Sequence, residues 1–246
     1  MNNERLYGLL DITSLGDLDN PSNIAQWTRR IAKVCLETEG RFRPAAICVY
    51  APLLGAAREG LGNLSIPLAA VAGNFPSGKS DLKLKSMETL RAIDAGANEI
   101  DWVIDRGAAL YSKGESVIQE VQAAREACGP VPLKVIFETG QIEDEHFLFD
   151  LACKALNAGA DFLKTSTGKI PIGATEAAAR VLCSAIKHTN ASAGFKASGG
   201  IRDHGAALRY VSIYETMVGK PATPSSFRLG ASTLAIELLR FEGISW

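Results

Sequence analysis

Lys164 stands in a short apolar segment of the sequence, where chemistry explains a lysine better than packing does. It follows Phe162 and Leu163 and precedes a turn rich in small polar residues. A strand that is buried on both faces normally consists of Val, Ile and Leu. A lysine amine in such a place can lose its proton and attack an aldehyde, forming a Schiff base. We therefore take Lys164 as the candidate nucleophile.

A repeated phrase brings an aspartate to the position that is equivalent to Lys164. Residues 94–101 (DAGANEID) align without gaps with residues 157–164 (NAGADFLK), so Asp101 corresponds to Lys164. A third apolar segment, residues 193–198, carries Lys196 before another turn. Three strand ends thus supply two amines and one carboxylate, a set that can form a Schiff base and move its protons.

Lys196 is expected to keep Lys164 unprotonated. Adjacent strands run about 4.8 Å apart, and two ammonium groups about 6 Å apart, at an effective dielectric constant near 20, repel by roughly 3 kcal/mol. Such repulsion lowers the pKa of one lysine while the other stays charged. The competing interpretation is an internal salt-bridge network of Lys164, Lys196 and Asp101 that does no chemistry.

Glycine-rich turns next to these segments predict a phosphate site. Glycines let backbone N–H groups approach an anion, and a helix start adds the positive end of its dipole. Three turns have this character, and a phosphorylated substrate follows from them. The candidate phosphate-binding residues are Gly168, Lys169, Gly199, Gly200, Arg202, Gly230 and Ser232.

Strand and helix patterns alternate along the whole chain, and no Ser/Gly-rich linker divides it. Eight strand-helix units in 246 residues favour an α/β fold with one domain, residues 1–246, that forms a (β/α)8 TIM barrel. No glycine-rich dinucleotide turn follows the first strand. Helix starts are expected at Asn20, Ser80 and Thr175. The expected strands lie near 8–13, 45–50, 66–74, 98–104, 132–138, 161–166, 193–198 and 226–231.

Composition narrows the class of partner. The formal net charge is -1 and the sequence has no basic run, which argues against nucleic acid or an anionic membrane as the main partner. No signal-peptide pattern or membrane-spanning apolar stretch is present, so a cytoplasmic protein with a small-molecule partner is expected. A homodimer stays possible.

Cysteines and histidines give no sign of a metal site. Five cysteines are scattered without a close pair, and we expect them to be reduced. None of the three histidines shares a strand end with an acid. We therefore expect no metal and no organic cofactor.

Five segments together are similar to the deoxyribose-phosphate aldolase family, and they run in order through nearly the whole chain. That family consists of class I aldolases, which work through a lysine Schiff base. The resemblance implies reversible cleavage of 2-deoxy-D-ribose 5-phosphate to D-glyceraldehyde 3-phosphate and acetaldehyde. It also implies Lys164 as the nucleophile, Lys196 as the second lysine and Asp101 as the acid/base. The segments are 45–50, 133–140, 161–169, 194–202 and 228–232.

Further residues are expected around the pocket. Asp11 and Thr13 end the first strand and match a motif of the family, so they are candidates for a substrate hydroxyl or a water, or for simple strand-end hydrogen bonding. Cys48 is similar to a cysteine that lines the family's pocket, although a small buried residue is the simpler interpretation. Lys134 and Thr167 are expected at or behind the pocket wall.

One departure from the family pattern concerns the end of the chain. Some members end in a tail with a terminal tyrosine that assists proton transfer, whereas this sequence ends at Trp246. An indole N–H cannot act as a phenol does. The protonation step here is therefore expected to use water with Lys196 or Asp101.

Three alternatives remain from the residues themselves. The chain could be a Schiff-base aldolase for another sugar phosphate, or an isomerase with Glu138 as its base. It could also be a sugar-phosphate-binding barrel without turnover. A metal-dependent aldolase is disfavoured because the histidines do not cluster.

Overall fold

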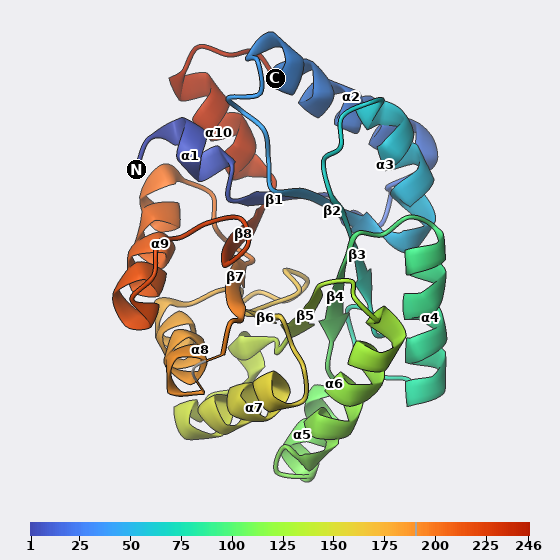
Figure 1. The fold of residues 1–246 in the computed structure, drawn as a ribbon, viewed down its shortest axis with the longest axis vertical. Helices are drawn as coiled ribbons and strands as arrows, with labels where there is room; N and C mark the ends of the chain where they lie inside the picture. Colours follow the sequence, from blue (N-terminus) through green and yellow to red (C-terminus); the bar gives the residue numbers. More distant parts are fainter. Residues whose placement is uncertain (190) are drawn as a thin grey trace.

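The computed structural model describes residues 1–189 and 191–246, and its centre is a closed parallel barrel. Eight strands pair in chain order, and β8 pairs with β1 to close the ring (Figure 1). This confirms the predicted TIM barrel and all eight strands. They are β1 Leu10–Thr13, β2 Ala46–Tyr50, β3 Leu68–Ala72, β4 Glu99–Val103, β5 Leu133–Ile136, β6 Phe162–Lys164, β7 Gly194–Ser198 and β8 Phe227–Ala231.

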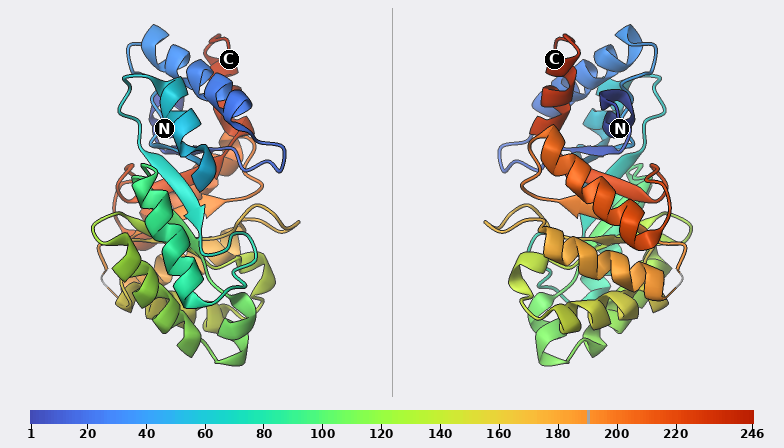
Figure 2. Two further views of the ribbon diagram at one scale, coloured as in Figure 1. Left: turned by 90° about the vertical axis from the view of Figure 1, so that its right-hand side faces the viewer. Right: turned by 90° about the vertical axis from the view of Figure 1, so that its left-hand side faces the viewer.

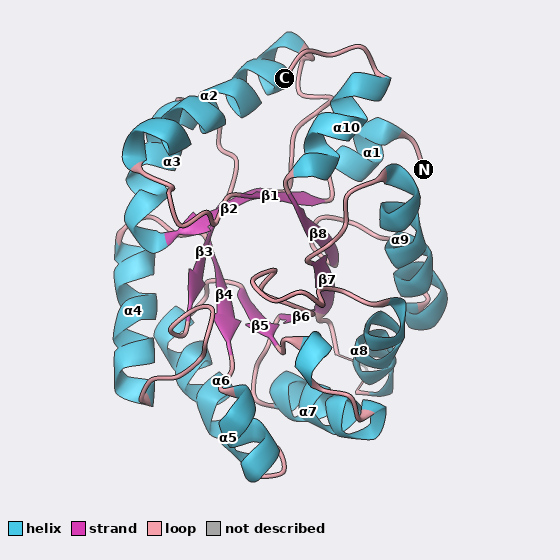
Figure 3. Cartoon of the chain, turned by 180° about the vertical axis from the view of Figure 1, so that it is seen from behind, coloured by secondary structure: helices cyan, strands magenta, loops and turns pink. Residues whose placement is uncertain are grey.

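Helices surround the barrel as an outer ring (Figure 3). Two 3-10 turns, η1 Ala51–Leu53 and η2 Thr139–Gln141, follow β2 and β5. The helices are α1 Asn3–Tyr7, α2 Pro21–Glu37, α3 Leu54–Leu61, α4 Leu82–Asp94, α5 Arg106–Tyr111, α6 Glu115–Cys128, α7 Glu145–Asn157, α8 Glu176–His188, α9 His204–Val218 and α10 Thr233–Phe241.

Side chains that cap helix starts fix the boundaries of the helices. Asn20 forms a capping box before Pro21, and the Thr175 side chain accepts a hydrogen bond from the Ala178 N–H, as expected. The expectation of a cap at Ser80 was wrong. Asp81 caps α4 by accepting from the Leu84 N–H. Ser and Asp are comparable as caps, so the sequence alone left this boundary uncertain by one residue.

Strand alternation divides the side chains into two sets. Residues such as Ile100, Leu163 and Phe195 are fully buried on the outer face of the barrel, in the hydrophobic core that also includes residues of the surrounding helices. Their neighbours in sequence point inward, and many of these are charged. The register pairs Asp101 with Lys134 and Lys164 with Lys196, so charged residues on adjacent strands stand at the same height.

The loops after β1 and β6 project from the same end of the barrel (Figure 2). The loop from residue 165 to residue 175 joins β6 to α8, and the loop from residue 14 to residue 20 joins β1 to α2. An ion pair of 3.0 Å between Lys169 and Asp17 links them. Among the helices of the described residues, none is long and apolar enough to cross a membrane.

Candidate active site

Seven charged side chains fill the interior of the barrel, and we call them the interior network. All seven are buried, and six of the eight strands contribute to them. Strand alternation places each of them on the inner face. The members are Asp11, Glu99, Asp101, Lys134, Lys164, Lys196 and Arg228.

Asp101 is the centre of the part of this network that includes Lys164. Its Oδ2 accepts hydrogen bonds from the amines of Lys164, at 2.6 Å, and of Lys196, at 2.8 Å. Its Oδ1 accepts from Lys134 at 2.8 Å. The two lysines that the sequence singled out therefore share one carboxylate oxygen, and Lys164 points into the barrel as predicted.

Arg228 and Glu99 form the other part of the network. The guanidinium group contacts Glu99 through two nitrogens, at 2.7 and 3.1 Å, and Asp11 at 2.5 Å. Lys134 bridges the two parts because it also contacts Glu99 at 2.6 Å. Asp11 in turn accepts a hydrogen bond from Lys196. Every carboxylate of the network is thus held by at least two cations.

The surroundings separate the two lysines in their affinity for a proton. Burial lowers the pKa of Lys164, the Asp101 carboxylate opposes that effect, and the charge of Lys196 reinforces it, so the net direction is downward. Burial also acts to lower the pKa of Lys196, but the carboxylates of Asp101 and Asp11 outweigh it and raise that pKa. The predicted direction for each lysine agrees, whereas the predicted cause needs correction because burial contributes more than repulsion by Lys196.

Asp101 is held in its ionised form. Burial alone would raise its pKa, but the three lysines around it outweigh burial and hold the pKa of this carboxyl well below its usual range. The same balance holds for Asp11, whose pKa is lowered by Arg228 and Lys196 against the effect of burial. A carboxylate in this state can accept a proton only transiently, as a proton shuttle does.

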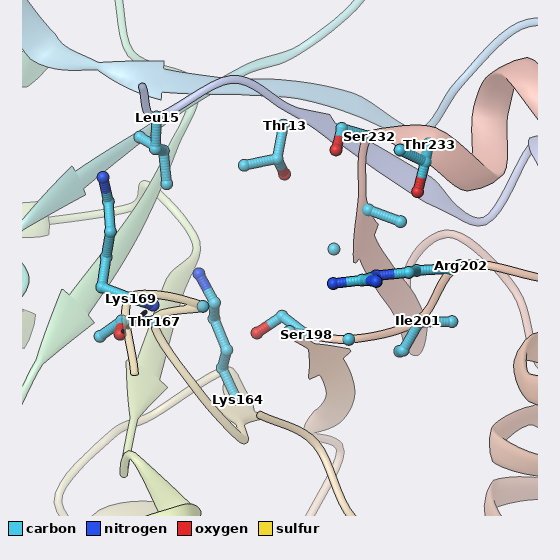
Figure 4. A pocket seen from close by; sticks show the side chains of 15 residues that line it. Thr13, Leu15, Lys164, Thr167, Lys169, Ser198, Ile201, Arg202, Ser232 and Thr233 are labelled. Carbon is cyan, nitrogen blue, oxygen red and sulfur yellow. Dashed lines mark hydrogen bonds between the residues drawn. The ribbon is translucent and has the colours of Figure 1, made fainter. Parts of the chain in front are cut away.

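The amine of Lys164 reaches a cavity of about 480 Å³ at the ends of β1, β6, β7 and β8 (Figure 4). Lys164 is the one member of the interior network that lines this cavity, and 2% of the residue is exposed. Asp101 and Lys196 lie behind it. A ligand in the cavity therefore meets the amine first.

All seven predicted phosphate-binding residues line the same cavity. Gly168 and Lys169 come from the loop after β6, Gly199, Gly200 and Arg202 follow β7, and Gly230 and Ser232 end β8 and open α10. Figure 4 shows Arg202 reaching into the cavity on the side where Ser232 and Thr233 begin α10. Two side-chain cations and the start of a helix suit an anion.

Gly230 shows why glycine is needed at the cavity wall. A Cβ atom at this position would lie 2.7 Å from the Ser198 Cβ and 3.2 Å from the Lys196 Cε. Gly199 and Gly200 have another reason, because their φ angles of 89° and 84° lie in the left-handed region. The glycines thus keep space for the lysine and turn the chain toward the cavity.

The secondary residues divide between the cavity wall and the network behind it. Thr13 and Thr167 line the cavity. Asp11 and Lys134 belong to the interior network and have no exposed surface. Cys48 is also fully buried, its Sγ lies 4.0 Å from Asp101 Oδ2, and burial raises the pKa of its thiol.

Glu138 follows β5 and lies outside the cavity lining. Its carboxyl group accepts hydrogen bonds from the backbone N–H of Thr167, at 3.1 Å, and from the Thr167 hydroxyl. That hydroxyl in turn accepts from the Lys169 N–H at 3.1 Å. Glu138 therefore holds the loop that carries Gly168 and Lys169, which leaves it poorly placed as the base of an isomerase.

Several residues of the site were not among the candidates that the sequence analysis selected. Ser198 and Thr233 line the cavity, and Glu99 and Arg228 complete the network. A charged residue of the inner face was a usable signal for Glu99, since it stands two residues before Asp101. Among the described residues, no group of three histidines, cysteines or acids is arranged to hold a metal ion.

Comparisons with known proteins bear on the fold and on the family of this chain. A crystal structure from Coccidioides immitis superposes with a TM-score of 0.84 at 24% identity, over 98% of this chain and 87% of that one, and it shares the fold. An aldolase designated QR15 has a TM-score of 0.80 and 26% identity, over 98% of each chain.

A third structure is the tetrameric deoxyribose phosphate aldolase of Aeropyrum pernix. It has a TM-score of 0.75 and 25% identity, over 98% of this chain and 92% of that one. The family model for DeoC/LacD family aldolases matches residues 16–213, which include β2 to β7 and five members of the interior network. By this match the chain belongs to the DeoC/LacD family of aldolases.

Proposed function

We propose that this enzyme reversibly cleaves 2-deoxy-D-ribose 5-phosphate to D-glyceraldehyde 3-phosphate and acetaldehyde, with Lys164 as the Schiff-base nucleophile. The observation that carries the proposal is the buried Lys164 amine at the wall of an anion-binding cavity, 2.6 Å from an ionised carboxylate. The similarity to the aldolase QR15 supports the reaction class, and the similarity to the deoxyribose phosphate aldolase of Aeropyrum pernix supports the substrate.

The geometry supports formation of the Schiff base at Lys164. The lone pair of the neutral Lys164 amine attacks C1 of the open-chain sugar, and the resulting carbinolamine loses water to give an iminium ion. Asp101 is within hydrogen-bond distance of this amine and of Lys196, so it can pass a proton between them. Because Asp101 does not line the cavity, its exchange with the substrate runs through Lys164 or a water.

Cleavage then uses the iminium ion as an electron sink. The C3 hydroxyl loses its proton, the C2–C3 bond breaks, and its electron pair moves into the iminium ion to form an enamine. D-glyceraldehyde 3-phosphate leaves first. The enamine takes a proton at C2, and water hydrolyses the new iminium ion to acetaldehyde and the free amine. Lys196 and Asp101 supply protons through water in this last step.

The phosphate group occupies the glycine-rich side of the cavity. Arg202 and Lys169 supply positive charge, and the backbone N–H groups near Gly200 and Ser232 supply hydrogen bonds. In this orientation the aldehyde carbon of the substrate faces Lys164. Thr13 and Thr167 then lie beside the sugar hydroxyls, where their own hydroxyl groups can bind them.

The interior network opposes the alternatives. A salt-bridge network without chemistry would have no reason to present one lysine to a cavity that is lined by anion-binding residues. The isomerase alternative needs a base at the cavity, and Glu138 is engaged by Thr167 instead. These points support an aldolase with turnover over a binding protein or an isomerase.

Trapping the Schiff base tests the proposal directly. Incubation with acetaldehyde and borohydride is expected to convert Lys164 to N-ethyllysine, a net addition of C2H4 that peptide mass spectrometry identifies. The Lys164→Ala variant should lose nearly all cleavage activity and all of the adduct. Lys83→Ala, an exposed residue of α4, is the matched control and should keep both. A folded wild-type protein that gives no adduct would refute the mechanism.

Product analysis separates the substrate from its competitors. Incubation with 2-deoxyribose 5-phosphate should release acetaldehyde and D-glyceraldehyde 3-phosphate in equal amounts. Turnover of a longer ketose phosphate with no acetaldehyde would instead support an aldolase of different specificity.

We also propose a homodimer. Leu84, Met87 and Leu90 leave an exposed apolar strip on α4, which a second copy could cover. Light scattering should give about twice the monomer mass of 26.2 kDa. A monomer mass would contradict the dimer without affecting the proposed reaction.

A further inference from the structure

The interior network contains one more cation than it contains carboxylates. Three acids, Asp11, Glu99 and Asp101, face four bases. All seven are buried, so solvent does little to screen an excess charge. If three of the four bases are charged, the interior is electrically balanced. The bases are Lys134, Lys164, Lys196 and Arg228.

The contacts of each base indicate which one gives up its proton. Lys134 lies within 2.8 Å of both Glu99 and Asp101, and Lys196 contacts both Asp11 and Asp101. Arg228 contacts Asp11 and Glu99, and a guanidinium group stays protonated in proteins. Lys164 has a single carboxylate oxygen, which it shares with Lys196. The excess charge is therefore released most easily at Lys164.

We propose that the charge balance of the whole interior network holds Lys164 as the neutral amine, and that Glu99 and Arg228 are positioning residues that each contribute one charge to this balance. Neither residue lines the cavity, so the pair does not touch the substrate and acts through Asp11, Lys134 and Asp101. This inference rests on the proposed Schiff-base role of Lys164.

Other groups around Lys164 leave this count unchanged. The buried carboxyl group of Glu138, after β5, is engaged by Thr167 and, among the described residues, by none of the four bases. On the inner face, β3 contributes Ala69 and Val71, which carry no charge, and β2 contributes the thiol of Cys48. At the cavity mouth Lys169 and Arg202 are exposed, so solvent screens their charges, and Lys169 is paired with Asp17. The strands provide these charged or titratable inner groups: Asp11 (β1), Cys48 (β2), Glu99 and Asp101 (β4), Lys134 (β5), Lys196 (β7) and Arg228 (β8).

Substitutions that change the count by one charge should have opposite effects. Arg228→Met removes a cation, so a protonated Lys164 then balances the three acids. The acid limb of the kcat/KM profile should move to higher pH by about one unit. At pH values on the acid side of the limb, kcat/KM should then be about tenfold lower than in the wild type. Glu99→Gln removes an anion and should move the same limb to lower pH. Arg228→Lys keeps the charge and should keep the limb near its wild-type position.

The double variant Glu99→Gln/Arg228→Met is the decisive case, because it restores the balance with two acids and two charged lysines. Its acid limb should return to within about 0.3 pH units of the wild type, whereas two independent structural defects would add their losses. Trapping with acetaldehyde and borohydride reports on the neutral Lys164 amine without turnover. The pH dependence of this trapping should shift among the variants in the same direction as the acid limb. Thermal unfolding checks that each variant is folded.

An exposed ion pair of the same residue types provides the matched control. Arg29 and Glu59 contact each other on the surface between α2 and α3, with side chains 55% and 65% exposed. Arg29→Met and Glu59→Gln should leave the limb unchanged. If Arg228→Met does not fold, the predicted shift of the acid limb to lower pH in Glu99→Gln tests the inference instead.

The outcomes separate this inference from the proposed function. A wild-type protein without an adduct on Lys164 overturns the proposed function and the inference with it. An adduct whose pH dependence is the same in folded Glu99→Gln as in the wild type overturns only the charge-balance role. Single variants that both lose activity at every pH, without recovery in the double variant, overturn it as well.

Discussion

At the scale of single residues, Lys164 differs from the other bases of the interior network in how few carboxylate oxygens it contacts. It has one such oxygen, and Lys196 shares it. Burial and Lys196 together lower its pKa, and Asp101 opposes them. The position of Lys164 at the cavity wall makes this free amine available to an aldehyde. The proposed nucleophile and its proposed proton shuttle thus consist of one carboxylate and two amines.

Removing Lys196 should weaken the nucleophile. In the Lys196→Met variant a positive neighbour is lost, so the pKa of Lys164 rises and the acid limb of the kcat/KM profile moves to higher pH. We expect a loss of about a hundredfold at neutral pH, because a proton donor is lost too. Steady-state kinetics from pH 5 to pH 9 measures both effects. Lys83→Met on the surface of α4 is the control, and an unshifted limb in folded Lys196→Met would contradict the tuning role.

At the scale of elements, the cavity depends on loops that follow the strands. The loop after β6 is fixed by Glu138, which binds both the backbone and the hydroxyl of Thr167. Glu138 itself has a φ angle of 54°, in the left-handed region that few residues other than glycine adopt. Such a conformation persists where surrounding contacts hold it. The buried carboxyl group thus positions Lys169 at the cavity without touching the ligand.

Glu138→Gln should therefore weaken phosphate binding more than it slows the chemical step. We expect KM for 2-deoxyribose 5-phosphate to rise by about tenfold, because a hydrogen bond from the loop to a charged acceptor is worth roughly 1.5–3 kcal/mol. Cleavage of unphosphorylated 2-deoxyribose, which has no phosphate group for Lys169 to bind, should change less. Steady-state kinetics on both sugars measures the difference. Glu143→Gln is the control, since Glu143 is exposed and lies in the same connection between β5 and α7 as Glu138. Equal losses with both sugars would argue against a role of Glu138 in positioning the loop.

At the scale of the whole molecule, ring closure brings charged residues of six strands into one buried electrostatic unit. β8 pairs with β1, which brings Arg228 to Asp11 across more than two hundred residues of sequence. Glu99 of β4 reaches the same arginine across the barrel interior. The network is therefore formed only when the barrel is closed, and its free energy belongs to the folded state.

The stability of the barrel should consequently depend on acid. The pKa values of Asp101 and Asp11 are lower in the folded protein than in the unfolded chain. Their contribution to stability is present above the unfolded pKa of about 3.9, and it is lost as pH falls through the lower folded values. The free energy of unfolding in urea should fall between pH 4 and pH 2. A constant value over that range would contradict the ionised state of these acids.

Local patterns in the sequence account for most of the fold. Alternation with period two and glycine punctuation predicted all eight strands, because these signals come from backbone geometry within a few residues. The same reasoning placed Lys164, Lys196 and Asp101 on the inner face, and it selected seven candidate phosphate-binding residues that all line one cavity. The cap of α4 at Asp81 was missed because two suitable capping residues are adjacent.

The sequence by itself determined the barrel, the inward-facing lysine at position 164 and the glycine-rich turns, since each depends on residues that are close in the chain. Only the tertiary structure decided how the charges inside the barrel are shared. The contact of Arg228 with Asp11 and Glu99, and the single carboxylate oxygen left to Lys164, depend on strands that meet only through ring closure. Burial also depends on the complete fold. It lowers the pKa of Lys164 more than repulsion by Lys196 does.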